Sequence, residues 1–361
     1  MLSKEEKLAR LKLARTDSIG ASKFWELIGA YGNGENVLKN LPRILKNTSI
    51  CSNDKISQEI FNMKSMGARF VFWEDELYPP LLRNIPDPPP ILSFLGNKDR
   101  VLSFYKKNLI SVVGARNASI HADKLCRTIC QDLSANDVII VSGLARGIDS
   151  SAHLGSLENG TIGISACGIN IVYPQENKKL YERIIGNSGI FSEMPFDTPP
   201  QPQLFPRRNR IIAGMSYGTA VIEAAEQSGS LITAKMALDY NRDVFAVPGF
   251  PLDPRSVGCN KLLKEGAILI QNAQDILEHL ENKKIIPMLE NNVPARISEQ
   301  DLEKTGEKIL SSLNSAPITI DELISCIKVS PREVLTVLLE LELTGKVIRL
   351  HGQRVCLALN G

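Results

Sequence analysis

The feature that most constrains the fold is a repeated order of apolar strand, glycine-rich turn and helix between residues 91 and 282. Several apolar runs, such as 138–141, are continuous, which is typical of strands buried on both faces of a parallel sheet. The helical segments between them, for example 119–135 and 230–240, have the length of crossover connections. We therefore expect an α/β domain with a doubly wound, mainly parallel sheet. Its strands are expected at 91–95, 109–113, 138–141, 161–166, 190–192, 219–222, 244–247 and 267–270.

A helical domain, SAM-like or helix–hairpin–helix-like, is expected before this sheet, over residues 1–75. Its apolar residues recur at helical spacing, and the tight connection 17–20 is of the kind found in helix–hairpin–helix modules. Such a turn donates backbone N–H groups to phosphate, whereas a purely structural helix pair is the simpler interpretation. A short strand at 69–73 and a proline-rich stretch at 78–90 then lead into the second domain, expected at 76–282.

A winged-helix domain is expected at 299–361, after a linker at 283–298. Its third helix carries more acidic than basic residues, so its charge disfavours strong DNA binding and favours a protein contact. The expected elements are helices near 300–313 and 319–327, a third helix that begins at Ser330-Pro331 and ends near Gly345, and strands at 347–350 and 354–357.

Composition limits the function classes. The 361 residues are 43% hydrophobic and 23% charged, which is ordinary for a soluble globular protein. A net charge of +2 is too small for capture of nucleic acid by the whole surface, so anion binding requires local clusters. No signal peptide and no membrane-spanning run is found, and seven scattered cysteines indicate reduced thiols. We expect a cytoplasmic protein that has no membrane contact and binds no metal or cofactor.

Two glycine-rich turns each follow an expected strand and each carry an arginine. Gly114 precedes Arg116 in the first turn, and Ser142-Gly143 precedes Arg146 in the second. Both turns are expected at the carboxyl edge of the sheet, where free N–H groups and guanidinium groups bind phosphate. The alternative is that each arginine pairs with a nearby carboxylate, Asp149 being available to Arg146. The dinucleotide fingerprint G-x-G-x-x-G is absent.

A basic cluster is the most specific motif. Arg207, Arg208 and Arg210 stand ahead of an apolar run that is expected to be a buried helix. Phe205 precedes them, and an aromatic ring beside guanidinium groups can hold a stacked base next to its phosphate. Asn209 can bond backbone or a base edge, and an ordinary solvated basic turn is the alternative. Because no acid, base, metal ligand or nucleophile accompanies the cluster, we expect a site that holds a phosphate backbone without cutting it.

Three further polar residues are interpreted more plainly. Asp149 is expected to cap the helix that follows it, and His153 to be packed or hydrogen-bonded within that helix. Glu223 is placed in a short helix, where it or Glu226 is expected to orient an arginine.

These motifs, in this order, resemble the DNA-processing protein A family (DprA, also called Smf). The resemblance implies an extended Rossmann-like domain that binds single-stranded DNA, forms a homodimer and helps load the RecA recombinase during natural transformation, with no catalytic residues. Several members have a lysine where this chain has Pro202. The motifs are VGARNAS at 113–119, SGLARGIDSSAH at 142–153, YPQEN at 173–177, FPRRNRIIAG at 205–214, SGSLITA at 228–234 and VPG at 247–249. The resemblance assigns Arg116, Phe205, Arg208 and Arg210 to the DNA pocket, with Gly114, Ser142, Gly143, Asn209 and Lys178 near it.

An enzyme is the second hypothesis. Residues 213–223 are similar to the P-G-G-x-G-T-x-x-E motif of the Lonely-guy and lysine-decarboxylase-like nucleotide N-glycosidases. The Pro-Gly-Gly is absent, and the spacing to the glutamate is longer by one residue. In this reading Glu223 would be the catalytic carboxylate, and the substrate would be a nucleoside monophosphate.

Overall fold

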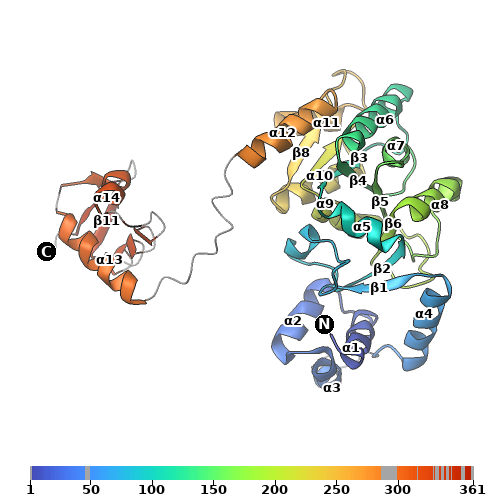
Figure 1. The fold of residues 1–361 in the computed structure, drawn as a ribbon, viewed down its shortest axis with the longest axis horizontal. Coiled ribbons are helices and arrows are strands. Elements are labelled where there is room, and N and C mark those ends of the chain that lie inside the picture. The colour runs from blue at the N-terminus through green and yellow to red at the C-terminus, as the bar shows by residue number, and fades with distance from the viewer. Residues whose placement is uncertain are drawn as a thin grey trace. The chain divides into compact units, whose positions relative to one another are not determined.

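The structure is a computed structural model in which the chain divides into two units, Met1–Lys283 and Lys284–Gly361 (Figure 1). Helix α12 (Ala273–Ile285) extends three residues into the segment expected as a linker, whose remaining residues lie outside the described part. The residues described are 2–44, 49–285, 299–314, 316–327, 329, 333–334, 337–338, 341–342, 344–350 and 354–358.

The first unit contains a nine-stranded sheet in the order β1-β2-β6-β5-β4-β3-β7-β8-β9. All neighbours from β6 to β9 are parallel, while β1 and β2 pair antiparallel at one edge. The expected α/β fold with a mainly parallel, doubly wound sheet is therefore confirmed. The strands are β1 (Arg69–Phe72), β2 (Ile91–Gly96), β3 (Asn108–Val113), β4 (Val138–Ser142), β5 (Thr161–Ser165), β6 (Gly189–Ser192), β7 (Gly218–Val221), β8 (Asp243–Ala246) and β9 (Ile268–Leu269).

The strand order reverses between β3 and β7. From β3 the chain builds outward through β4, β5 and β6, then crosses back to place β7 on the other side of β3. The turns after β3 and β7 diverge at this point, which is where open α/β sheets bind ligands.

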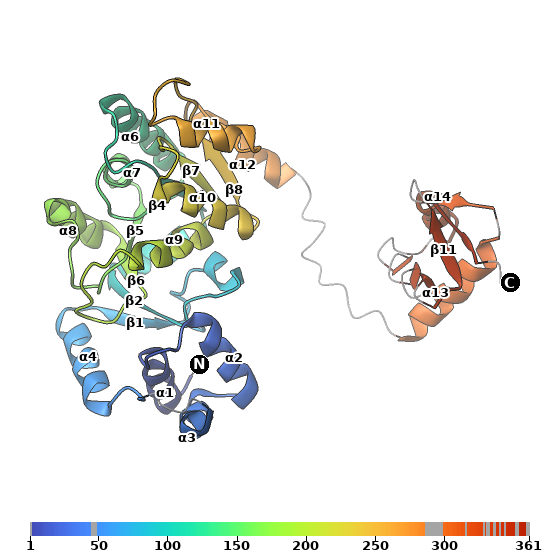
Figure 2. The same cartoon turned by 180° about the vertical axis from the view of Figure 1, so that it is seen from behind.

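Helices cover both faces of the sheet. Helices α6 and α7 pack on one face, while α9 and α10 pack on the other, which is turned toward the viewer in Figure 2. The crossover helices expected at 119–135 and 230–240 are α6 and α10, capped by the hydroxyls of Ser119 and Ser228. The helices that connect the strands are η1 (Leu81–Asn84), α5 (Lys98–Phe104), α6 (Ile120–Ala135), α7 (Ile148–Ser156), η2 (Gln175–Asn177), α8 (Lys178–Asn187), α9 (Leu204–Met215), α10 (Gly229–Asp239) and α11 (Val257–Lys264).

The N-terminal segment is helical, as expected, and it is joined firmly to the sheet. Trp25 donates its indole N–H to the carbonyl of Pro88, and Glu59 of α4 accepts the backbone N–H of Phe196, after β6, at 3.1 Å. Strand β1, which the expected boundary at residue 75 assigned to the helical domain, is the edge strand of the large sheet. The four helices are α1 (Lys4–Ala14), α2 (Ala21–Tyr31), α3 (Gly34–Ile44) and α4 (Asn53–Ser65).

The second unit has the expected elements where it is described. Helices α13 (Glu299–Ser312) and α14 (Ile320–Ile327) pack around Ile309 and Leu323. The expected hairpin is the antiparallel pair β11 (Val347–Leu350) and β12 (Arg354–Leu357), and β10 (Ile318–Thr319) adds a third strand. The predicted start of the third helix at Ser330-Pro331 lies outside the described residues.

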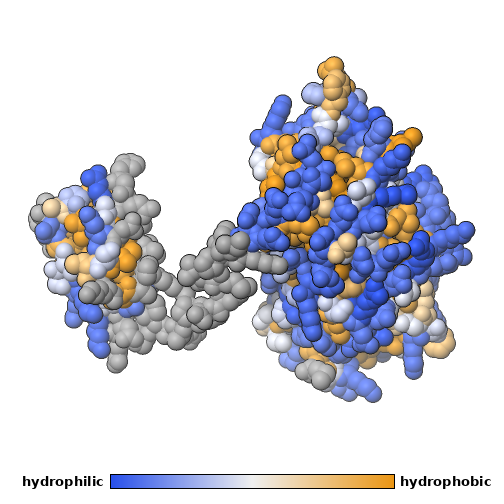
Figure 3. Space-filling view, turned by 45° about the horizontal axis from the view of Figure 1, so that its top comes forward, coloured by the Kyte–Doolittle hydropathy of each residue, from blue (hydrophilic) through white to orange (hydrophobic). Residues whose placement is uncertain are grey.

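The surface of the first unit is mostly hydrophilic in the view of Figure 3, where apolar residues form scattered patches. Among the described residues, no helix is both long enough and apolar enough to cross a membrane.

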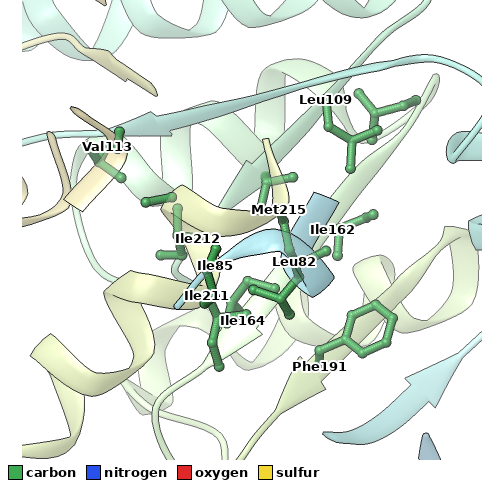
Figure 4. Packing of buried hydrophobic residues seen from close by; sticks show 14 of the residues in the cluster. Leu82, Ile85, Leu109, Val113, Ile162, Ile164, Phe191, Ile211, Ile212 and Met215 are labelled. Carbon is green, nitrogen blue, oxygen red and sulfur yellow. The ribbon is translucent and has the colours of Figure 1, made fainter. Parts of the chain in front are cut away.

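Helix α9 is anchored by its apolar half. Ile211 and Ile212 are buried against Leu82 of η1, against Ile85, which follows η1, and against the sheet (Figure 4). Burial of each such side chain contributes about 1.5–3 kcal/mol. Because this half of α9 is part of the core, the first turns of the helix are held in place beside the carboxyl edge of the sheet.

Candidate nucleic-acid interface

Two connected hollows lie along the carboxyl edge of the sheet. The larger, here called the outer groove, has a volume of ≈ 850 Å³ and is lined by residues 113–117, the start of α9 and residues 227–230. It therefore lies at the point where the strand order reverses between β3 and β7. The smaller, here called the inner hollow, has a volume of ≈ 530 Å³ and is lined by residues 143–146, 165–167 and 173–175. Tyr173, Phe205 and Arg116 line both.

Arg116 and Phe205 meet at the border of the two hollows. The guanidinium carbon of Arg116 lies 4.7 Å from the centroid of the Phe205 ring, which is a cation–π contact. Arg116 is exposed, and within the described part of the chain its side chain forms no ion pair or hydrogen bond. The sequence places these two residues in different motifs, and the fold brings them together.

Arg208 also lines the outer groove, and its side chain is only 5% exposed. Its Nη1 donates to the carbonyl of Ile164 at 3.2 Å and lies 3.9 Å from Oδ2 of Asp149. Burial lowers the pKa of Arg208, and the nearby Asp149 opposes that shift. Its Nε has no hydrogen-bond partner within the described residues. Arg208 therefore supplies a positive charge to the floor of the outer groove.

Gly143 makes room for this arginine. A β-carbon at position 143 would overlap the guanidinium of Arg208. Gly114 is needed for a different reason, since a β-carbon there would lie 2.6 Å from Ile148 at the start of α7. Both glycines line the hollows, as the sequence predicts, and the structure gives each of them a close-packing role.

Arg207 and Arg210 lie away from both hollows. They share the carboxylate of Glu193, at 3.0 Å for Arg207 and 2.6 Å for Arg210, and Arg210 also bonds the backbone of Asp87. The prediction that the arginines precede a helix is wrong, because α9 already begins at Leu204. With about 3.6 residues per turn, positions 205 and 208 share one side of the helix and positions 207 and 210 share another. The basic cluster is therefore divided between the groove and an ion network.

Arg146 is paired at the rim of the inner hollow. Its Nε lies 2.6 Å from Oε1 of Glu176, and both side chains are more than half exposed. The alternative reading of the sequence, an arginine–carboxylate pair, is thus found, with Glu176 in place of Asp149. Asp149 instead accepts the N–H of Ala145 at 3.3 Å and so holds the turn before α7, while the residue that caps this helix is Gly147.

The remaining predicted residues divide into two groups. Asn209 lines the outer groove and donates to the carbonyl of Gly229 at 3.4 Å. Ser142 is fully buried, and its hydroxyl bonds the carbonyl of Val112, so it joins two strands. Lys178 is exposed at the start of α8 and lines neither hollow.

His153 is a packed residue, as expected. Its ring is fully buried, and Nδ1 lies 2.7 Å from the hydroxyl of Thr161. Burial lowers the pKa of His153 to about 3, and the positive charge of Arg208 adds to this shift.

Glu223 lies neither in the short helix expected for it nor in the lining of the hollows, where a catalytic carboxylate would be needed. It lies in the loop after β7 and not in a short helix. Its carboxylate accepts the N–H of Ser119 at 2.8 Å, at the start of α6, and it is outside the lining of both hollows. The carboxylate that the enzyme hypothesis requires is therefore hydrogen-bonded to the N-terminus of α6.

Sequence reasoning missed two residues that shape the interface. The ring of Tyr173 lies 5.7 Å from that of Phe205, centroid to centroid. Asn177 donates to the carbonyls of Leu144 and Ala145 and so supports the second glycine-rich turn. Both belong to the YPQEN motif, but a motif gives no indication of the neighbour that a side chain meets across the fold. No cluster of possible metal ligands occurs among the described residues.

Comparison with known proteins agrees with this architecture. Residues 69–281 match the family described as DNA recombination-mediator protein A. The chain belongs to this family. Residues 4–61 match the DprA-like N-terminal HHH domain and residues 293–353 the DprA winged helix domain, so the expected domain types are confirmed.

Relatives of the family cover most of the chain. Protein Smf of Synechocystis is 36% identical over 315 residues, which is 79% of each protein. DNA processing protein DprA of Streptococcus pneumoniae is 43% identical over 209 residues, or 57% of this chain and 72% of that protein. The crystal structure of the latter aligns with a TM-score of 0.65 and 31% identity, over 77% of this chain and 98% of that one. DNA processing protein A of Helicobacter pylori aligns with a TM-score of 0.54 and 28% identity, over 60% and 97%, and its structure is described as showing a unique single-stranded DNA binding mode.

Proposed function

We propose that this chain binds single-stranded DNA along the outer groove and the inner hollow, and that it acts in DNA recombination without itself altering the DNA covalently. The observation that carries the proposal is the contact of Arg116 with Phe205. An exposed guanidinium with no ion pair in the described part of the chain is suited to a phosphate and an aromatic ring to a base, and single-strand binders combine the two. The similarity to the Helicobacter pylori protein supports the same assignment. The residues proposed to contact or shape the site are Gly114, Arg116, Gly143, Arg146, Phe205, Arg208 and Asn209.

A single strand fits this site better than a duplex. Phe205 lies between two hollows, so a base must leave its stack to reach the ring. Bases paired within a duplex are not available for such contacts, whereas every unpaired base offers a face to an aromatic ring. We therefore expect little sequence preference and weak binding of blunt duplex DNA.

The carboxylates near the site support a role without catalysis. Asp149 faces Arg208 and the N–H of Ala145, Glu223 accepts the N–H of Ser119, and Glu176 pairs with Arg146. Each has a structural partner. The groove thus presents cations and backbone groups to a strand, which suits binding.

We extend the proposal to a partner. The resemblance to the family implies that a homodimer of this chain helps RecA recombinase to assemble on single strands in the cytoplasm, as in natural transformation. The match to a recombination-mediator family supports this step. With strands precovered by single-strand binding protein, wild-type protein should shorten the delay before RecA-dependent strand exchange, and Arg116→Ala should not.

Arg116→Ala tests the proposed site directly. Fluorescence anisotropy of labelled oligo-dT, and of the matching duplex, would be measured over a range of salt concentrations. We expect weaker binding to the single strand and a slope of log K against log salt that is smaller by about 0.7, the contribution of one phosphate. Arg69→Ala is the matched control. Arg69 is an exposed arginine on the edge strand β1, so its substitution removes the same charge at a place away from the site. Equal losses for both variants would indicate a general charge effect and contradict the proposed site.

A further inference from the structure

Tyr173 and Phe205 form an aromatic wall between the outer groove and the inner hollow. Their ring centroids are 5.7 Å apart, with an angle of 52° between the planes. Both residues line both hollows, so each hollow is bounded on one side by this wall. A DNA strand that follows the carboxyl edge of the sheet from β7 toward β5 has to pass this aromatic wall.

The side chain of Tyr173 is open to solvent. It is 45% exposed, and within the described residues its side chain makes no hydrogen bond. The aromatic ring of Phe205 is its one aromatic neighbour in the described part of the chain. A large ring left open to solvent at the mouth of a hollow is available for a ligand.

The charges of the two hollows differ. The residues that line the inner hollow include two cations, of which Arg146 is paired with Glu176 and Arg116 lies at the border. The deeper walls are the uncharged segments 165–167 and 143–145. A phosphate is therefore favoured at the border and an uncharged group is favoured inside. The volume of ≈ 530 Å³ is within the range of about 300–1,000 Å³ that is usual for small-molecule pockets, so a nucleobase can enter.

We propose that Tyr173 is a second stacking side chain for the DNA strand and that the inner hollow receives one unpaired base, while the phosphate of that nucleotide stays at Arg116. This inference rests on the proposed function, and it adds a subsite on the far side of Phe205. The backbone then turns at the wall, and the two bases on either side of the turn stack on different rings.

Tyr173→Ala and Tyr173→Phe test the inference on the full chain. Binding of oligo-dT would be measured by anisotropy. Loss of a stacking ring weakens single-strand binding by about five- to hundredfold, so we expect that loss for Tyr173→Ala, while Tyr173→Phe should bind like wild type. Tyr217→Ala is the control, because Tyr217 is 43% exposed but lies next to the start of β7, outside both hollows.

Modified oligonucleotides add a readout that depends on the base. In wild type, one abasic position within a short dT strand should weaken binding, and the same change should have no further effect in Tyr173→Ala. A 2-aminopurine at that position should lose fluorescence on binding wild type and keep it on binding Tyr173→Ala.

The outcomes separate the two proposals. Wild-type affinity in Tyr173→Ala, together with weak binding by Arg116→Ala, would overturn the inner-hollow subsite and leave the proposed function standing. Failure of the folded wild type to bind any single strand would overturn the proposed function itself.

Discussion

The guanidinium of Arg208 occupies the space that a side chain at Gly143 would fill. One residue belongs to the second glycine-rich turn and the other to α9, so the contact joins the two motifs that border the site. The arginine lies within the protein, facing Asp149 and the carbonyl of Ile164, instead of extending into solvent.

Gly143→Ala should displace Arg208 and weaken both the fold and the site. Overpacking of this kind reduces the free energy of unfolding by about 1–3 kcal/mol. Gly186→Ala is the matched control, since Gly186 is in α8 with open space around it and alanine there should stabilise by about 0.5–1 kcal/mol. Urea unfolding and oligo-dT binding measure the two effects, and equal stability of the two variants would contradict the close packing.

Arg210→Ala should act on stability and not on DNA affinity. It would leave Glu193, which is 5% exposed, without its closest buried partner, and breaking a buried pair reduces the free energy of unfolding by about 3–5 kcal/mol. Arg207→Ala removes a side chain that is 44% exposed, so the loss should stay below about 1 kcal/mol. Denaturant titrations give both values. A large loss of affinity in folded Arg210→Ala would instead place this arginine in the DNA site.

His153 should make the first unit sensitive to acid. Its pKa is lowered to about 3 in the fold from an ordinary value of 6.5, so below pH 6.5 the unfolded chain takes up a proton that the folded chain does not. Stability from this residue is therefore complete above pH 6.5 and falls by up to about 1.4 kcal/mol per pH unit as the pH decreases toward 3.

His153→Gln should remove this part of the pH dependence, while His121→Gln, at an exposed position, should keep it. Urea unfolding at pH 7, 6 and 5, followed by the fluorescence of Trp25 and Trp73, reports the first unit, which contains the two tryptophans of the chain. Identical pH slopes for wild type and His153→Gln would show that the buried imidazole does not contribute.

Pro202→Lys should strengthen binding. Pro202 lines the outer groove and is exposed, at the position where the resemblance to the family predicts a lysine. A lysine there adds a cation without removing a buried contact, so the salt slope for oligo-dT should increase by about 0.7. Pro202→Gln controls for loss of the proline ring. An unchanged slope would mean that the strand does not pass this side of the groove.

The order of strands and helices follows closely from local sequence. Continuous apolar runs locate the buried strands, and Ser119 and Ser228 mark the helix starts that their hydroxyls cap. The strand expected at 69–73 is β1, but its position at the edge of the large sheet did not follow from its sequence. Its partner β2 comes later in the chain, and pairing between distant segments leaves no local signal.

The site could be predicted only in part. The glycine-rich turns were singled out because strand ends meet at one edge of a sheet, and Phe205 because it precedes the arginine cluster; neither argument needs coordinates. The helix was expected to begin after the arginines, so the sequence offered no reason to expect Arg208 on one side of α9 and Arg207 and Arg210 on another. Tyr173 was missed because its importance depends on a ring from another element.

The sequence alone determined the class of fold, the edge of the sheet that carries the site and the kinds of group gathered there. These depend on residue type and spacing, which act over a few neighbouring positions. Only the tertiary structure decided that Arg116, which has no ion pair among the described residues, lies against the ring of Phe205. It also decided that Arg208 is buried against Gly143 and that Arg207 and Arg210 pair with Glu193. The partner of a charged side chain is set by which segments pack together, and that packing is a property of the whole chain.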